Sequence, residues 1–159
     1  MKKNILSLFV LLAALAVFAG CSHDDKTEII NIIEGGQQVT GLPDDWKAVH
    51  EDNIYPKSMM VIIDQTGIPT EIGTNDRLAA FVGGVCRNVS EPLVGTEGYT
   101  RYQFKISLPA SMVVAGGNNV ELRYYSDKNH LIFTSQPIPF VEDSHLGEYM
   151  KGYKPVWKK

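Results

Sequence analysis

The chain has 159 residues, of which 44% are apolar and 21% are charged, and its formal net charge is −3. These figures predict one folded domain and exclude a chain that is disordered throughout. They also argue against nucleic acid as a partner, because phosphate recognition needs clusters of Lys and Arg.

Residues 1–20 are predicted to be a signal peptide. Lys2 and Lys3 form a basic start, and an almost unbroken apolar run follows from Ile5 to Ala19. A run of about 15 residues suits the core of a signal peptide, and it is shorter than the roughly 20 needed to span a bilayer.

The end of the apolar run predicts how the protein is anchored. Residues 18–21, Phe-Ala-Gly-Cys, resemble the lipobox of bacterial lipoproteins. The resemblance implies that the Cys21 thiol is lipidated and that Cys21 becomes the first residue after cleavage. Cleavage removes 20 residues and two lysines, which leaves 139 residues with a net charge of −5. An anionic membrane surface repels such a domain, so the lipid is expected to hold the protein at the membrane.

Residues 22–25, Ser-His-Asp-Asp, follow the lipobox directly. They resemble the Ser-rich and acid-rich export signal of Bacteroidetes surface lipoproteins. That resemblance implies a lipid-anchored protein of the outer membrane whose domain lies on the extracellular face. An ordinary hydrophilic tether is the alternative interpretation.

Residues 21–40 are predicted to be a lipidated N-terminus and a flexible tether. Gly-Gly-Gln-Gln at residues 35–38 is interpreted as a flexible joint, because glycine leaves the backbone unrestricted. The apolar segment Ile29–Ile33 could instead be an added strand or a contact between two copies.

Cys86 is the one cysteine besides Cys21, so the mature chain is expected to form no intrachain disulfide.

Residues 41–159 are predicted to form an all-β domain. Residues 101–108 alternate apolar and polar side chains, the period of a half-buried strand. Turn residues separate about seven such segments, which predicts an antiparallel two-sheet β-sandwich, with an open barrel as the alternative. A short helical turn at residues 45–50 is the one weak helical signal. The expected strands are residues 58–64, 77–82, 85–89, 101–108, 119–126, 131–135 and 137–139.

Gly83-Gly84 predicts a tight turn between two of these strands. The turn would pair Val82 with Val85, then Phe81 with Cys86, and then Ala80 with Arg87. Arg87 would then lie among apolar neighbours, and a buried guanidinium needs a partner. Asp76 is predicted to be that partner in a structural ion pair, and a ligand anion held by Arg87 is the alternative.

The same hairpin resembles a domain that is common in secreted and surface proteins of Bacteroidetes. The matching residues are Asp76, Leu78–Val82, Gly83-Gly84 and Cys86-Arg87. The resemblance implies an immunoglobulin-like β-sandwich, and it implies no defined activity.

Catalytic and metal-binding patterns are not recognisable in the sequence. Cys86 is expected in mid-strand, where a cysteine behaves as a small apolar residue. Asp143, Ser144 and His145 are adjacent in the chain, so their side chains point apart, whereas a catalytic triad needs side chains that converge. The histidines show no metal-ligand spacing. We therefore expect no enzyme, no cofactor and no metal.

Aromatic residues are the candidates for ligand binding. Tyr149, Tyr153 and Trp157 recur every four residues, and Tyr125 is expected to face away from the core residues of its strand. Exposed Tyr and Trp side chains can stack on sugar rings or anchor a protein. The alternative is that they cover an open edge of the core.

These features together predict a non-enzymatic binding or adhesion module for a glycan or an envelope protein, tethered to the membrane by its lipid. A structural subunit of an envelope assembly and a small glycan-acting hydrolase are the alternatives.

Overall fold

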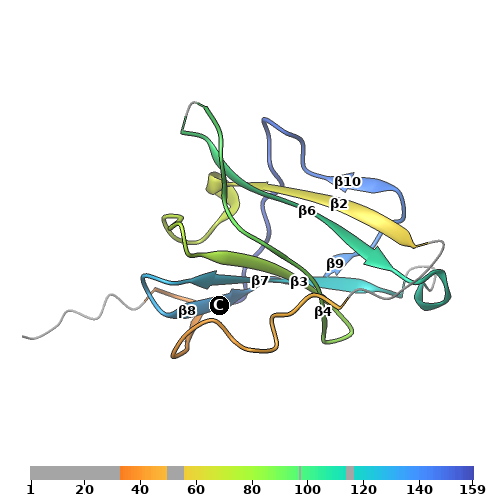
Figure 1. Ribbon diagram of the computed structural model, residues 1–159, viewed down its shortest axis with the longest axis horizontal. Coiled ribbons are helices and arrows are strands. Elements are labelled where there is room, and N and C mark those ends of the chain that lie inside the picture. Colours follow the sequence, from red (N-terminus) through yellow and green to blue (C-terminus); the bar gives the residue numbers. More distant parts are fainter. Residues whose placement is uncertain (1–32, 50–55, 97, 114–116) are drawn as a thin grey trace, which may run out of the picture. The chain divides into compact units, whose positions relative to one another are not determined.

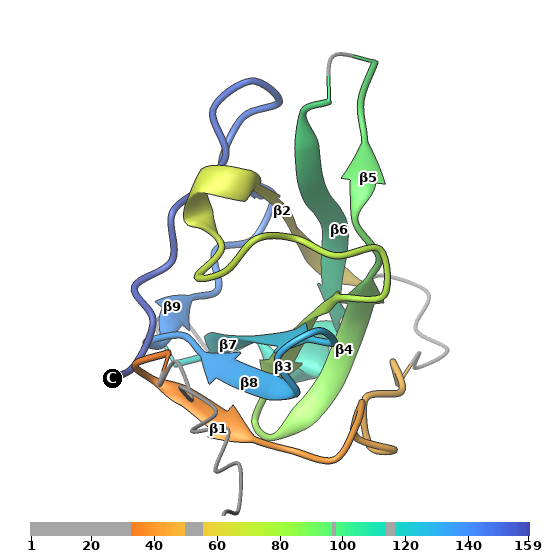
Figure 2. The ribbon, with the colours of Figure 1, turned by 90° about the vertical axis from the view of Figure 1, so that its left-hand side faces the viewer.

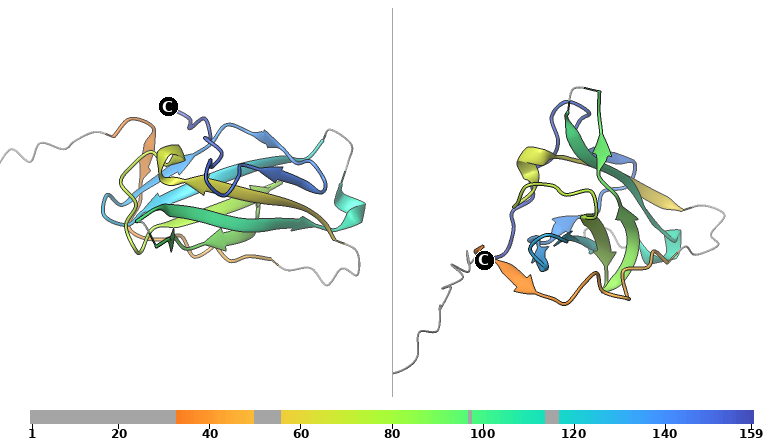
Figure 3. Two further views of the ribbon diagram at one scale, coloured as in Figure 1. Left: turned by 90° about the horizontal axis from the view of Figure 1, so that it is seen from above. Right: turned by 60° about the vertical axis from the view of Figure 1, so that its left-hand side comes forward.

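Two β-sheets packed face to face form the part of the chain that the computed structural model describes, residues 33–49, 56–96, 98–113 and 117–159. The strands of the two layers run in similar directions (Figures 1 and 3). The all-β sandwich predicted from the sequence is therefore confirmed. The predictions for residues 1–32, including Cys21 and most of the Ile29–Ile33 segment, lie outside the described residues.

The first sheet has the strand order β1-β8-β7-β3-β4, and β9 pairs with the start of β7. The second sheet has the order β10-β2-β6-β5. Two short 3₁₀ turns, Gln65–Gly67 and Ala110–Met112, connect strands. The strands are β1 (Gly36–Gln38), β2 (Lys57–Asp64), β3 (Arg77–Val82), β4 (Val85–Ser90), β5 (Leu93–Val94), β6 (Thr100–Leu108), β7 (Asn119–Ser126), β8 (Leu131–Thr134), β9 (Ile138–Pro139) and β10 (Ser144–Leu146).

The alternating segments bury the faces that the sequence predicts. On β6 the buried side chains are Tyr102, Phe104, Ile106 and Leu108. On β7 the side chains that face this core are Val120, Leu122 and Tyr124, which pack against β6 between the sheets. This shared core sets every second residue of β7, including Glu121 and Arg123, on the outer face of the first sheet.

Three short strands extend the predicted set of about seven. β5 and β10 have two and three residues, too few to show a period of two. β10 pairs with β2 in parallel, so the second sheet is not purely antiparallel as expected. No helix forms at residues 45–49, where the sequence weakly indicated one, and Trp46 is instead buried.

The first strand, β1, lies in the segment that was predicted to be a tether. It pairs with β8, and the folded unit begins at Ile33 rather than at residue 41. The glycines serve close packing here. A Cβ on Gly36 would lie 3.0 Å from Leu131 Cδ1, and one on Gly35 would lie 2.4 Å from the carbonyl oxygen of Lys158. Glycine in a strand often marks such a close approach of two chain segments. The sequence-based prediction of a flexible joint did not take this role of glycine into account.

Gly35→Ala is expected to lower the free energy of unfolding by about 1–3 kcal/mol, because Gly35 has φ of +88° and no room for a Cβ. Urea unfolding measures the change. Gly41→Ala is the matched control, since nothing lies within 4 Å of its Cβ position, and it should change stability by less than about 0.5 kcal/mol. Equal, small effects of both changes would show that residues 35–41 behave as a tether.

The hairpin of β3 and β4 contains a β-bulge that the sequence did not predict. Val82 pairs with Val85 and Phe81 with Cys86, as expected, but Ala80 pairs with Asn88. Arg87 is therefore the extra residue of the bulge, and the predicted pairing is wrong beyond Cys86. The side-chain amide of Asn88 donates to the carbonyl oxygen of Lys105 at 2.8 Å, which links β4 to β6 across one edge of the sandwich.

A second apolar cluster covers part of the outer face of the first sheet. The chain after β1 crosses this face below β3 and β4 (Figure 2). Trp46, in that segment, packs edge-on against Phe81 with ring centroids 5.9 Å apart. The cluster also contains Ala79, Cys86, Tyr125 and Ile132.

Candidate functional site

The four aromatic residues proposed as ligand contacts do not form one patch. Tyr125 is buried in the second cluster, and its hydroxyl donates to Asp127 Oδ1 at 2.9 Å. Tyr153 and Trp157 pack against the main core, and the Trp157 indole N–H donates to the carbonyl oxygen of Gly67 at 2.9 Å. These three support the alternative that the aromatics cover the core.

Tyr149 is the one of the four that is well exposed, at 56%. The guanidinium of Arg101, on β6, lies 4.0 Å from the centre of its ring. A shallow cavity of about 630 Å³ lies beside it and is lined by His145, Glu148 and Lys151 among others. Tyr149 thus remains a surface aromatic whose ring already has a cationic partner.

Asp76 and Arg87, the predicted ion pair, have other partners. Both are buried, at 1% and 4% exposure. The Asp76 carboxylate accepts hydrogen bonds from Gly73 N at 2.7 Å, Asp127 N at 2.8 Å and the Tyr124 hydroxyl. The Arg87 guanidinium donates to Met112 Sδ at 3.5 Å. No ion pair between the two appears within the described residues, since Asp76 lies before the start of β3 and the bulge places Arg87 in the middle of β4.

A second buried carboxylate, Asp64 at the end of β2, holds the loop before the C-terminal segment. It accepts from Gly152 N at 2.9 Å, Thr66 N at 2.8 Å and the Tyr99 hydroxyl at 3.2 Å. Burial acts to raise the pKa of Asp64, but the hydrogen bonds from Thr66, Gly152 and Tyr99 outweigh burial and lower the pKa below 3.8. Asp64 is therefore a structural carboxylate that stays ionised.

Acid should weaken the fold through Asp64. A carboxyl group whose pKa is lowered by folding stabilises the protein above its unfolded-state pKa, and this stabilisation is lost as the pH falls through the folded value. The difference in unfolding free energy between the protein and Asp64→Asn should therefore be largest near about pH 7 and shrink below about pH 3.8. Urea unfolding at several pH values measures it, and a constant difference down to about pH 2 would contradict the role of the charge.

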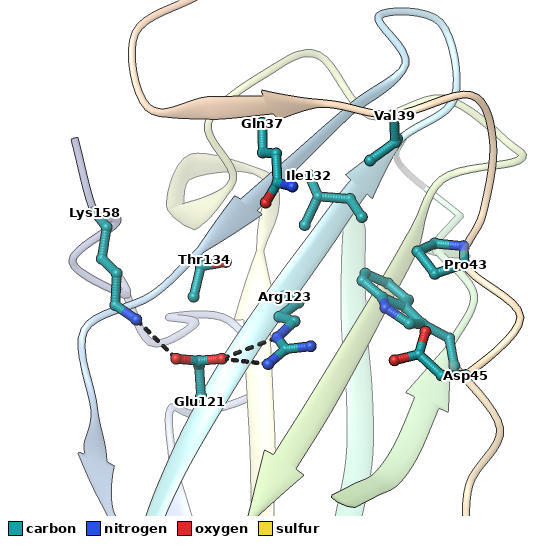
Figure 4. Close-up of a pocket in the computed structure, with 10 residues that line it drawn as sticks. Gln37, Val39, Pro43, Asp45, Glu121, Arg123, Ile132, Thr134 and Lys158 are labelled. Carbon is teal, nitrogen blue, oxygen red and sulfur yellow. Dashed lines mark hydrogen bonds and ion pairs between the residues drawn. The ribbon is translucent and has the colours of Figure 1, made fainter. Parts of the chain in front are cut away.

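A groove of about 490 Å³ opens on the outer face of the first sheet, beside the second cluster (Figure 4). Its side chains come from four separate parts of the chain, namely the segment from β1 to Trp46, strands β7 and β8, and the C-terminal end. The lining residues are Gln37, Val39, Pro43, Asp45, Trp46, Glu121, Arg123, Ile132, Thr134 and Lys158.

A chain of charges crosses this groove. Glu121 Oε1 accepts from Arg123 Nε at 2.9 Å, and Arg123 Nη2 lies 2.8 Å from the same oxygen. Glu121 Oε2 accepts from Lys158 Nζ at 2.7 Å. Partial burial acts to raise the pKa of Glu121, but the hydrogen bonds and charges of Lys158 and Arg123 lower it below 4.5. Two cations thus share one carboxylate.

The backbone explains why these three side chains meet. Glu121 and Arg123 are alternate residues of β7, so both project from its outer face. The C-terminal segment runs beside β8, where Lys158 N donates to the carbonyl oxygen of Thr134 at 2.8 Å. Trp157 points into the core, and Lys158, the next residue, extends toward Glu121 (Figure 4).

Arg123 is held in place from two sides. Its guanidinium carbon lies 3.9 Å from the centre of the Phe81 ring, and Glu121 binds one edge of the guanidinium. Arginine has five N–H groups, of which Glu121 accepts two. In the part of the chain that the structure describes, the other three have no acceptor, and Figure 4 shows the guanidinium among the lining side chains, with Glu121 on one side and Asp45 on the other.

Sequence reasoning missed this groove. The sequence shows Glu121 and Arg123 only as the polar half of an alternating strand, and Lys158 is far away along the chain. The pairing of β7 with β8 and the course of the C-terminal segment bring them together. The chain offers no local motif that predicts such a contact.

Comparison with known proteins assigns no family, because no family model, curated protein or solved structure matches the chain. Within the described ranges, no group of three or more His, Cys, Asp or Glu side chains is placed to hold a metal ion. None of the helices in these ranges has the length and apolar character needed to cross a membrane.

Proposed function

We propose that this is a lipid-anchored protein of the outer membrane, and that its β-sandwich is a non-enzymatic binding or adhesion module for a glycan or a protein on the extracellular face. The lipobox-like residues ending in Cys21 and the acidic residues that follow support the anchoring. The resemblance of the β3–β4 hairpin residues to a domain of surface proteins supports both the location and an immunoglobulin-like type of sandwich.

The groove is the observation that supports a binding role best. Arg123 is fixed by Glu121 and Phe81, yet it lines the groove and three of its N–H groups have no acceptor among the described residues. A preorganised polar group in a concave site lowers the entropy that a ligand must lose on binding. The fold itself uses only part of this guanidinium, so the remaining donors are available to a ligand.

A glycan array and a pull-down from cell envelopes test the binding role on the full-length protein. Arg123→Gln is expected to reduce capture of the bound glycan or protein. Arg101→Gln is a matched control, because Arg101 also lies over an aromatic ring, on the other sheet. Loss of capture with Arg101→Gln alone would place the site at Tyr149, and no capture by either assay would reject the binding role.

Anchoring is tested separately. Cys21→Ser should abolish incorporation of labelled palmitate and should release the protein from the membrane fraction. Protease treatment of intact cells should degrade the unaltered protein if its domain lies outside. Unchanged membrane association of Cys21→Ser would contradict the lipid anchor, and complete protection from protease would place the domain on the periplasmic side.

A further inference from the structure

We infer that the groove around Arg123 recognises the carboxylate of an acidic saccharide, of the hexuronic acid class. This inference rests on the proposed binding function and names the ligand class for the same groove. It depends on two properties of the groove, which are the geometry of Arg123 and the polar groups at the rim.

The geometry of Arg123 suits a carboxylate. A guanidinium presents two parallel N–H donors along an edge, which match the two oxygens of a carboxylate. Glu121 already occupies one edge of Arg123, at 2.8–2.9 Å, and shows that the group binds carboxylates in this position. The Phe81 ring, 3.9 Å from the guanidinium carbon, fixes its plane. The unused donors are therefore set in direction before a ligand arrives.

The charges of the groove lining balance. Arg123 and Lys158 carry two positive charges, and Glu121 and Asp45 carry two negative charges. Arg123 and Glu121 are partly buried, with side-chain exposures of 30% and 28%, so water screens them less than fully exposed groups. A ligand carboxylate at Arg123 would pair with the guanidinium donors that Glu121 leaves unused.

Asp45 is the one further charged residue in the lining, and it makes no ion pair with Arg123 within the described residues. Its side chain lies across the groove from Glu121 (Figure 4). It can accept hydrogen bonds from hydroxyl groups of a ligand, but its charge repels a ligand carboxylate. Removing that charge should therefore strengthen the binding of an acidic saccharide.

The rim of the groove suits a saccharide better than a peptide. Gln37 supplies an amide and Thr134 a hydroxyl, and these short polar groups pair well with sugar hydroxyls. Val39 and Ile132 supply an apolar surface for the C–H face of a ring. The neighbouring edge of β8 is already paired with β1, so a peptide cannot extend the sheet there as an added strand.

Isothermal titration calorimetry of the full-length protein with trigalacturonic acid tests the inference. The fully methyl-esterified trisaccharide is the matched probe, because it keeps the rings and hydroxyls but lacks the charge. We expect the acid to bind at least about tenfold more tightly than the ester, as a charge-assisted bidentate pair implies. We also expect the affinity for the acid to fall as salt is raised.

Three variants locate the contact. Arg123→Lys keeps the charge but loses the paired donors, and it should weaken binding of the acid by about tenfold or more while leaving the ester unaffected. Asp45→Asn should strengthen binding of the acid about two- to fivefold, because it removes an exposed like charge. Arg101→Gln, on the other sheet, should change neither. Asp45 is exposed, so this variant is informative even if changes at Arg123 disturb the fold.

The outcomes separate this inference from the proposed function. Equal affinity for the acid and the ester, or binding of neutral glycans alone, would overturn the carboxylate inference and leave the binding module intact. Preference for a peptide with a free C-terminal carboxylate over both trisaccharides would overturn the saccharide class. Weaker binding of the acid by Asp45→Asn would contradict the placement of the ligand carboxylate. Failure of every glycan, peptide and envelope protein to bind would reject the binding role itself.

Discussion

Replacing Asp76 with alanine is expected to lower the free energy of unfolding by about 3–5 kcal/mol. Asp76 is 1% exposed and joins two parts of the chain, since it accepts hydrogen bonds from Gly73 N in its own loop and from Asp127 N and the Tyr124 hydroxyl near the end of β7. Alanine would leave these buried donors without their acceptor, and each unpaired donor costs about 1–3 kcal/mol. Urea unfolding followed by far-ultraviolet circular dichroism measures the loss.

Tyr124→Phe is the control for Asp76→Ala. It removes one donor to Asp76 and keeps the ring, which packs in the main core. It should therefore destabilise the protein by only about 1–2 kcal/mol. A loss below about 1 kcal/mol for Asp76→Ala would show that the loop before β3 and the end of β7 do not depend on this carboxylate.

Gly152→Ala is expected to lower the free energy of unfolding by about 2–4 kcal/mol. A Cβ at this position would lie 2.2 Å from the backbone nitrogen of Asp64. The chain would have to move away from β2, and the hydrogen bond from Gly152 N to Asp64 Oδ2 at 2.9 Å would be lost. Thermal and urea unfolding should both show the change.

The neighbouring change Lys151→Ala controls for the loop. Lys151 is exposed and its side chain makes no hydrogen bond or ion pair in the described part of the chain, so the change should be within about 0.5 kcal/mol. If Gly152→Ala had the same free energy of unfolding as Lys151→Ala, the loop at residue 152 would be able to move away from Asp64 without loss of stability.

The long strands were predictable because each repeats one physical pattern several times. β6 alternates over nine residues and β7 alternates up to Tyr124, which is enough to identify the core-facing side of each strand. Strands β1, β5 and β10 have two or three residues and show no such repeat. β1 was also not predicted because it begins with a glycine. In a sequence glycine suggests flexibility, whereas in this fold it allows close packing.

The pairing partners were less predictable than the strands. The turn at Gly83-Gly84 sets the first two pairs of the hairpin, but the bulge at Arg87 shifts every later pair by one residue. Arg87 was expected to be buried and to pair with Asp76, and it is buried, but Asp76 instead accepts hydrogen bonds from Gly73 N in its own loop and from Asp127 N and the Tyr124 hydroxyl. The contacts with Asp127 and Tyr124 depend on the folded chain rather than on sequence spacing.

For the candidate site, the sequence suggested only which residue types could contact a ligand, and it did not suggest where the site lies. Aromatic residues were proposed because Tyr and Trp often contact ligands, yet Tyr125, Tyr153 and Trp157 serve the fold. The groove instead uses Glu121, Arg123 and Lys158, which sequence reasoning had no means to bring together.

Chemical-shift mapping by NMR, with trigalacturonic acid added to the isotope-labelled full-length protein, tests most directly whether the groove is a binding site for acidic saccharides. The predicted result is a set of shifts confined to amides around Gln37, Arg123, Thr134 and Lys158, which the methyl-esterified trisaccharide does not reproduce at the same concentration. Shifts centred on Tyr149 and Arg101, or the same shifts with acid and ester, would contradict the assignment of the groove.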